Sequence, residues 1–161
     1  MTEAHKDDYA AYFFHQGSDC RAYKYLGSHK ENDKIAFRVW APNADSVYVV
    51  GDFNSWGEAH PMTRITERGI WEIYIDGSVV GCGDLYKYKI INGDKELYKA
   101  DPYAFFSQNP PETASKIYNL DGYAWSDSEY MKGLSYNHLD KPINVYEVNL
   151  ASYKRHEDGS Y

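Results

Sequence analysis

Cysteine is scarce in this chain, which carries only Cys20 and Cys82 among its 161 residues. Two cysteines cannot build the disulfide framework that holds many small secreted domains together, so the fold must rest on a hydrophobic core. The six histidines show no H-x-x-H spacing, and the cysteines no C-x-x-C spacing, so no metal site is expected. A Gly-rich phosphate loop followed by a helix is also missing, and we expect no cofactor.

Long hydrophobic runs are missing as well. No stretch approaches the roughly 20 apolar residues of a membrane-spanning helix, and the start, MTEAHKDDYA, lacks the apolar region of a signal peptide. Basic residues are in the minority, because 17 Lys and Arg stand against 24 Asp and Glu, a formal net charge of -7. An acidic chain disfavours nucleic acid and anionic membranes as partners. We therefore expect a soluble, cytoplasmic protein that binds neither nucleic acid nor membrane.

What the chain does contain is tyrosine, 17 in all, and short apolar segments separated by turns. In the segments 34–40 and 46–52, apolar residues alternate with others, as in strands that bury one face. Asn92-Gly93 predicts a hairpin between two later segments. Short strands at regular intervals predict an all-β fold, an immunoglobulin-like β-sandwich. The expected strands are 34–40, 46–52, 70–76, 84–92, 95–99 and 115–120.

The sandwich is expected over residues 20–122, with an irregular entry at 21–33. Residues 1–19 form a helical extension whose helix is expected at 7–16, and residues 123–142 form a linker. In the linker, the capping box Ser126-Asp127-Ser128-Glu129 predicts a short helix that ends near Gly133.

The final segment, residues 143–161, opens with INVYEVNL. Such a dense apolar run is typical of a strand covered on both faces, as in a parallel sheet. The chain lacks the neighbours that such a strand needs. We therefore expect a chain truncated just inside a second domain, with an exposed strand that favours aggregation.

The loop after the second predicted strand, Gly51-Asp52-Phe53-Asn54, is expected to turn sharply and present Trp56. We interpret Asn54 as a turn former. An indole is a flat apolar plate with one N–H donor, and such a plate suits the C–H face of a sugar ring. This loop therefore predicts a carbohydrate-binding module.

The chain carries a series of motifs in a fixed order, and the series resembles the N-terminal region of bacterial 1,4-α-glucan (glycogen) branching enzymes. The resemblance covers about residue 20 to the end. Its motifs are YLGSH at 25–29, FRVWAPNA at 37–44, VVGDFNSW at 49–56, HPM at 60–62, LYKYKI at 85–90, KADPYA at 99–104 and INVYEV at 143–148.

The resemblance implies a family-48 carbohydrate-binding module that packs against a (β/α)8 barrel of glycoside hydrolase family 13. Residues 143–161 would then begin with the first barrel strand. Enzymes of this family cleave an α-1,4-glucan through a covalent glycosyl-enzyme and transfer the segment to a 6-hydroxyl. The catalytic carboxylates belong to later strands. We therefore expect no catalytic residue and no activity in this chain alone. One departure is Asn149-Leu150-Ala151-Ser152-Tyr153, where the family usually reads His-Leu-Gly-Ser-Trp.

The resemblance also implies a binding site for α-1,4-glucan, either glycogen or a maltooligosaccharide. Trp56 matches the sugar-stacking Trp of related glycogen-binding modules, and Tyr98 falls where those modules carry their second stacking aromatic. Lys87 matches a Lys that bonds glucose hydroxyls. Strand parity predicts that Lys87 and Lys89 point outward into solvent.

The other tryptophans are expected to pack against protein. Trp40 and Trp71 are interpreted as core or domain-interface residues, and Trp125 as an interdomain packing residue.

The sequence is also compatible with other functions. One alternative is a structural brace for the missing catalytic barrel, without affinity for glucan. Others are the same module from a debranching enzyme or a trehalose-releasing hydrolase, or an unrelated immunoglobulin-like interaction domain.

Overall fold

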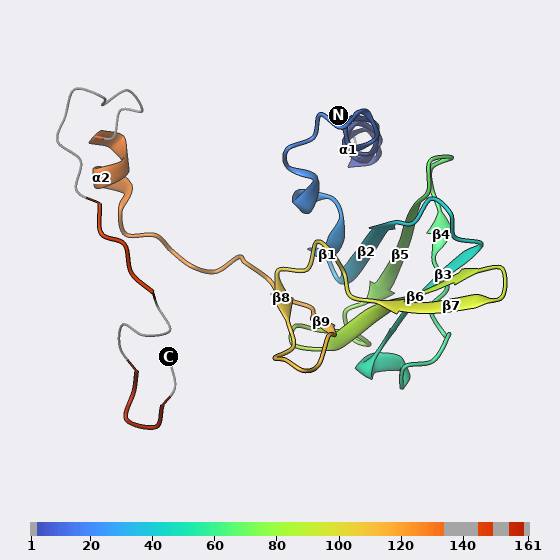
Figure 1. The fold of residues 1–161 in the computed structure, drawn as a ribbon. Helices are drawn as coiled ribbons and strands as arrows, with labels where there is room; N and C mark the ends of the chain where they lie inside the picture. Colours follow the sequence, from blue (N-terminus) through green and yellow to red (C-terminus); the bar gives the residue numbers. More distant parts are fainter. Residues whose placement is uncertain (1–2, 134–144, 150–154, 160–161) are drawn as a thin grey trace. The chain divides into compact units, whose positions relative to one another are not determined.

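The computed structural model describes residues 3–133, 145–149 and 155–159. The chain divides into two compact units, Met1–Gly122 and Tyr123–Tyr161 (Figure 1). All the described strands belong to the first unit. Within the described residues, neither helix has the length and apolar character needed to cross a bilayer.

The first unit is built from two antiparallel sheets, which confirms the predicted all-β sandwich. One sheet has the order β1-β2-β5-β4, and its strands are β1 (Gly27–Glu31), β2 (Lys34–Trp40), β5 (Ile70–Asp76) and β4 (Thr63–Arg64). The second has the order β3-β6-β9-β8, and β7 also pairs with β6. Its strands are β3 (Ser46–Gly51), β6 (Leu85–Asn92), β9 (Ser115–Lys116), β8 (Phe106–Ser107) and β7 (Lys95–Lys99).

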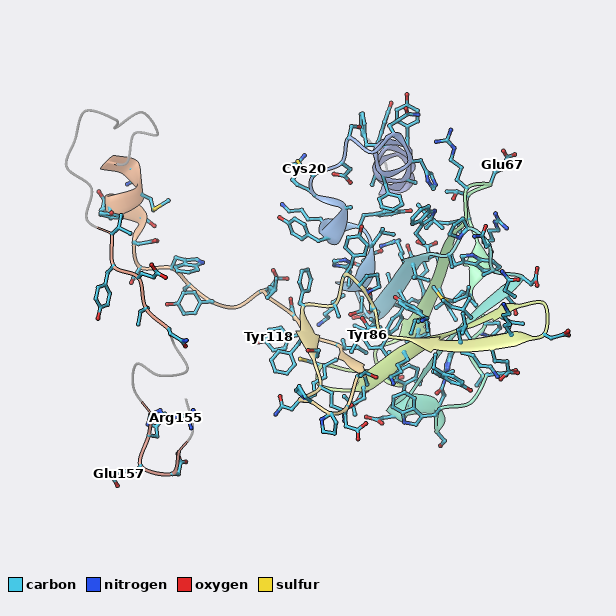
Figure 2. The ribbon with its side chains drawn as sticks, viewed as in Figure 1. Cys20, Glu67, Tyr86, Tyr118, Arg155 and Glu157 are labelled. Carbon is cyan, nitrogen blue, oxygen red and sulfur yellow. The ribbon has the colours of Figure 1, made fainter. Side chains whose placement is uncertain are left out.

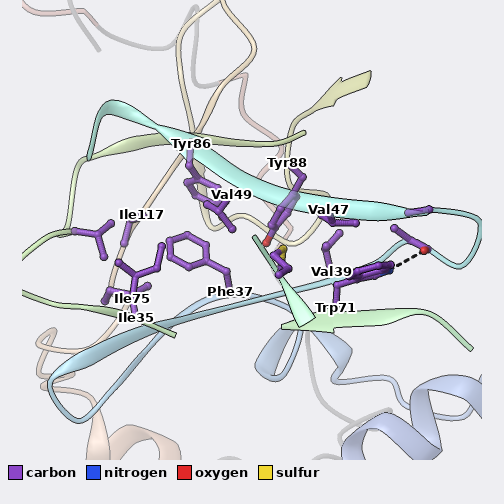
Figure 3. Close-up of a cluster of buried hydrophobic side chains, with 14 residues drawn as sticks. Ile35, Phe37, Val39, Val47, Val49, Trp71, Ile75, Tyr86, Tyr88 and Ile117 are labelled. Carbon is purple, nitrogen blue, oxygen red and sulfur yellow. Dashed lines mark hydrogen bonds between the residues drawn. The ribbon is translucent and has the colours of Figure 1, made fainter. Parts of the chain in front are cut away.

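The core lies between these two sheets and is shown in Figure 3. Phe37 of β2, Val47 and Val49 of β3, and Tyr86 and Tyr88 of β6 are all fully buried in it. In β3 and β6 the spacing of two residues confirms the predicted placement of these side chains on the core face, because neighbouring side chains of a strand point to opposite faces. Strand β2 differs from the prediction, since Ala36 and Arg38 on its other face are buried as well. Apolar burial of this kind is the main term that holds the sheets together.

Helix α1 (Glu3–Gln16) is longer than the segment 7–16 predicted from the sequence. Gly17 follows its last residue with a φ of +70°, a conformation that glycine adopts easily after a helix C-terminus. Ala11 is buried in a second cluster with Leu26 and Ile70, and Phe14 packs against that cluster. The helix is therefore part of the first unit.

The segment 21–33 is more ordered than predicted, because it contains the 3-10 helix η1 (Ala22–Lys24) and strand β1. Strand β1 has the sequence GSHKE, without β-branched or aromatic residues, and is paired along its whole length with β2. Backbone pairing with a neighbour overrides weak strand propensity here. The two-residue strands β4 and β8 were also missed, and the strand predicted over 115–120 is limited to Ser115–Lys116.

The second unit contains the predicted short helix, α2 (Ser128–Gly133). The predicted strand over 143–150 is wrong where it is described, since residues 145–149 are not in a strand and are exposed. A strand is stabilised by neighbouring strands, and none is described in this unit. Residues 143–144 and 150, and the predicted domain boundary at 142, lie outside the described residues.

Candidate functional site

A tight loop follows strand β3 and begins with the 3-10 helix η2 (Asp52–Asn54). The side chain of Asn54 holds this loop, because its Oδ1 accepts a hydrogen bond from the N–H of Gly51 at 2.9 Å. Its Nδ2 donates to the carbonyl of Val49 at 2.8 Å. Asn54 is therefore a turn former, as predicted. Gly51 must lack a side chain, since a Cβ there would lie 2.2 Å from the carbonyl oxygen of Leu85.

Trp56 follows this loop in a conformation that large residues rarely adopt. Ser55 and Trp56 have φ of +53° and +61°, in the left-handed region. The backbone N–H of Trp56 donates to the carbonyl of Gly51 at 2.9 Å, and its indole Nε1 donates to Asp52 Oδ1 at 3.2 Å. The side chain is 38% exposed. Strained backbone that is held by several bonds, with an exposed indole, is characteristic of a ligand-contacting loop.

Lys87 and Tyr98 lie on the outer face of the second sheet. Tyr86 and Tyr88 point into the core, so Lys87 and Lys89 point outward from the same strand. Tyr98 is directly opposite Lys89 in the β6–β7 pair, and residues opposite each other share a face. Tyr98 is 51% exposed, so its ring is available to a ligand.

The Lys87 ammonium donates to the hydroxyl of Thr113 at 2.8 Å. An ammonium group has three N–H donors. This bond leaves it two further donors, and it also holds the side chain in place.

Lys89, which the sequence predicted to be solvated, is only 6% exposed. It forms ion pairs with Glu58 and, at 2.9 Å, with Glu96, and its Nζ lies 5.7 Å from the centre of the Tyr98 ring. These hydrogen-bonded carboxylates, Glu58 first, raise the pKa of Lys89 above its ordinary value. Glu58 belongs to the loop after Trp56 and Glu96 to strand β7. Lys89 therefore ties the Trp56 loop to the strand that carries Tyr98.

Below this face, strand β6 is anchored by a buried carboxylate. Asp101 is 6% exposed and accepts hydrogen bonds from the hydroxyls of Tyr86 at 2.6 Å and Tyr88 at 3.2 Å, and from the N–H of Tyr103 at 2.8 Å. Burial raises the pKa of Asp101, and burial with the nearby carboxylate raises the pKa of both tyrosines. This network fixes the strand from which Lys87 points outward.

The tryptophans outside the loop differ in their surroundings. Trp71 is a core residue as predicted, and its Nε1 donates to the carbonyl of Ala41 at 2.9 Å. Trp40 was expected in the core or at a domain interface, and it is not in the core, since it is 51% exposed. Its ring meets the ring of Phe14 edge-on with 5.6 Å between ring centres, and its Nε1 donates to the carbonyl of Arg68 at 2.9 Å. It lies at the last position of strand β2, where the core no longer covers it. Trp125 is 74% exposed.

The prediction from the sequence did not include Glu58, Glu96 and Thr113 among the residues of this face. A hairpin register counted from Asn92-Gly93 places Glu96 opposite Ile91 and Tyr98 opposite Lys89, so that part was accessible from the sequence. The contacts of Glu58 and Thr113 depend on how two loops return to the sheet, and no local pattern encodes them. Among the described residues, no three His, Cys, Asp or Glu are grouped so that they could hold a metal ion.

Comparison with known proteins identifies the family. Residues 25–104 match the family model of carbohydrate-binding module 48 (isoamylase N-terminal domain). The chain is 47% identical to the 1,4-alpha-glucan branching enzyme GlgB of Halothermothrix orenii, a match over 96% of this chain and 25% of that enzyme. It is 42% identical to GlgB of Bacillus subtilis, over 100% of this chain and 26% of that enzyme.

A solved structure shares the fold. The maltotriose complex of PulA from Klebsiella pneumoniae superposes with a TM-score of 0.50 at 26% identity, over 60% of this chain and 11% of that one. The chain spans about a quarter of the length of the two GlgB branching enzymes that it matches. Through residues 25–104, this chain belongs to the carbohydrate-binding module 48 family.

Proposed function

We propose that this chain binds α-1,4-glucan as the non-catalytic, carbohydrate-binding part of a 1,4-α-glucan branching enzyme. The ligand would be glycogen or a maltooligosaccharide. The observation that supports the proposal is the outer face of the second sheet, which carries Lys87 and Tyr98, together with the strained loop that presents Trp56. Glu58, two residues after Trp56, forms an ion pair with Lys89 of that face. The relatives named above are branching enzymes, and PulA was solved with maltotriose, which supports the choice of an α-glucan.

The chemistry of binding follows from these side chains. The exposed rings of Trp56 and Tyr98 offer flat apolar surface to the C–H faces of glucose units. The two remaining donors of the Lys87 ammonium bond hydroxyl oxygens. Lys89, tied to Glu58 and Glu96, keeps the Trp56 loop and the Tyr98 strand in one arrangement, so little ordering is needed on binding. A single face of this kind binds weakly, and a polymer compensates through many contacts.

The test is affinity electrophoresis of the chain in gels with and without glycogen, with Trp56→Ala, Trp56→Tyr and Trp125→Ala beside the wild type. We expect glycogen to retard the wild type and Trp125→Ala, which removes an exposed indole of the second unit. Trp56→Ala should lose most of the retardation and Trp56→Tyr should keep part of it. Equal retardation of the wild type and both Trp56 variants would contradict the proposed site.

The second candidate function is a structural brace for a catalytic barrel. It is favoured by the exposed aromatic side chains of the second unit, Tyr123 at 71% and Trp125 at 74%. Large exposed aromatic side chains are characteristic of surfaces that other protein parts cover. Absence of retardation in the wild type would support this function over glucan binding.

A further inference from the structure

A cavity of about 480 Å³ opens on the first unit, and none of Trp56, Lys87 and Tyr98 is among its lining residues. Its floor is apolar, because Ile35, Val80 and Ile117, which line it, are almost fully buried. Ligand pockets commonly have this size and combine an apolar lining with a few polar groups that orient the ligand.

The rim of this cavity carries charges of both signs in equal number. Lys30 and Lys34 supply two positive charges, and Asp33 and Asp76 supply two negative charges. Ammonium groups only donate hydrogen bonds and carboxylates only accept them. Such a rim has no net charge to attract an anion or a cation, yet it offers donors and acceptors together. That combination suits a neutral ligand rich in hydroxyl groups.

Tyr118 supplies a flat aromatic surface at the same place. It is 44% exposed at the edge of the sandwich, where Figure 2 labels it, and one face of its ring stacks on Phe106 with ring centres 5.4 Å apart and planes 22° apart. The stack holds the ring in a fixed orientation. Tyr118 also lines a second cavity of about 250 Å³, which shares Ser28, Lys30 and Asn119 with the first. Tyr118 therefore lines both of these adjoining hollows.

We propose that the two adjoining hollows that Tyr118 lines form a second α-glucan site. A sugar unit would pack against the ring face that Phe106 does not cover, and the lysines and aspartates of the rim would bond sugar hydroxyls. The identity of the sugar rests on the proposed function, whereas the site itself shares no residue with the Trp56 face. Two sites on one module let a single polymer bind at both, which raises its apparent affinity beyond that of either site.

The test compares glycogen with maltotriose, which is too short to bridge distant sites. The wild type, Trp56→Ala, Tyr118→Ala and the double variant are run in glycogen gels, with Tyr130→Ala as the control for loss of an exposed tyrosine. Each single variant should weaken glycogen binding by about tenfold or more, and the double variant should abolish it. In the Trp56→Ala variant, maltotriose should still shift the amide NMR signals of Ser78, Gly81 and Asn119, which line the cavity.

The outcomes separate the two sites. If Tyr118→Ala binds glycogen like the wild type and Trp56→Ala does not bind it, the second site is overturned and the proposed function stands. If Trp56→Ala binds normally and Tyr118→Ala does not, the second site stands and the Trp56 face is overturned. If the wild type binds neither glycogen nor maltotriose, both proposals fail. Should Tyr118→Ala not fold, Lys30→Ala serves instead, because Lys30 is an exposed rim residue.

Discussion

Asn54→Ala tests whether the loop that presents Trp56 is held by a single amide side chain. The change removes the partners of the Gly51 N–H and the Val49 carbonyl, at 2.9 and 2.8 Å, and the hydrogen bond of Asn54 Nδ2 to His60 Nδ1 at 2.9 Å. Each of the two lost bonds to a backbone group costs about 1 kcal/mol and the third adds to them, so the free energy of unfolding should fall by about 2 kcal/mol or more. For a chain of this length that corresponds to a decrease in Tm of about 6 °C.

Thermal unfolding followed by circular dichroism measures the change, with Asn92→Ala as the matched control. The Asn92 side chain donates one exposed hydrogen bond, to the carbonyl of Asn43. An exposed bond contributes less than a buried one because water replaces it, so this variant should lose no more than about 2 °C. If Asn54→Ala unfolds at the same temperature as Asn92→Ala, the side chain does not hold the loop and the reasoning is refuted.

Two further changes test the supports of the face. Lys89→Met should weaken retardation by glycogen without abolishing it, because the ion pairs with Glu58 and Glu96 that tie the Trp56 loop to strand β7 are lost. Lys89→Arg keeps the positive charge and should be retarded almost as much as the wild type. Equal binding by Lys89→Met and the wild type would show that this tie is not needed. Asp101→Asn tests the buried carboxylate, whose pKa in the folded protein lies above the ordinary 3.8. The folded protein therefore holds this proton more tightly than the unfolded chain, so the stability of the wild type relative to Asp101→Asn should fall as the pH rises from about 4 to 7. Tm values of both proteins across that range measure the difference, and a difference that stays constant or grows with pH would contradict the raised pKa.

The limits of several strands were predictable from the sequence. Lys34–Trp40 and Ile70–Asp76 have the predicted limits, because their apolar residues and the turns that flank them are local signals. The prediction that Lys34–Trp40 buries only one face is wrong, since residues 35–39 are all buried. Strand β1 was missed because its stability comes from pairing with β2 and not from its own residues. The strand expected at 143–150 shows the converse in the part that the structure describes, because the apolar residues 145–149 are not in a strand and no strand is described in their unit.

Parts of the candidate site were predictable in the same way. The sequence of the loop indicated its sharp turn, and strand parity placed Lys87 on the outer face, as the structure shows. Strand parity also placed Lys89 on the outer face, but it could not predict that Lys89 is buried. The burial depends on Glu58, which contacts Lys89 from a loop 31 positions away in the chain. The cavity beside Tyr118 combines three separate segments of the chain, 28–35, 76–82 and 117–119, and no local motif in the sequence predicts it.

The most direct test of glucan binding at the Trp56 face is a titration of the isotope-labelled chain with maltoheptaose, followed by NMR. We expect the signals of the Trp56 indole N–H and of the backbone amides of Lys87 and Tyr98 to shift on binding, while the indole signal of Trp71, which is buried in the core, stays in place. Binding that leaves these three signals unmoved, or no shift of any signal at high ligand concentration, would contradict this expectation.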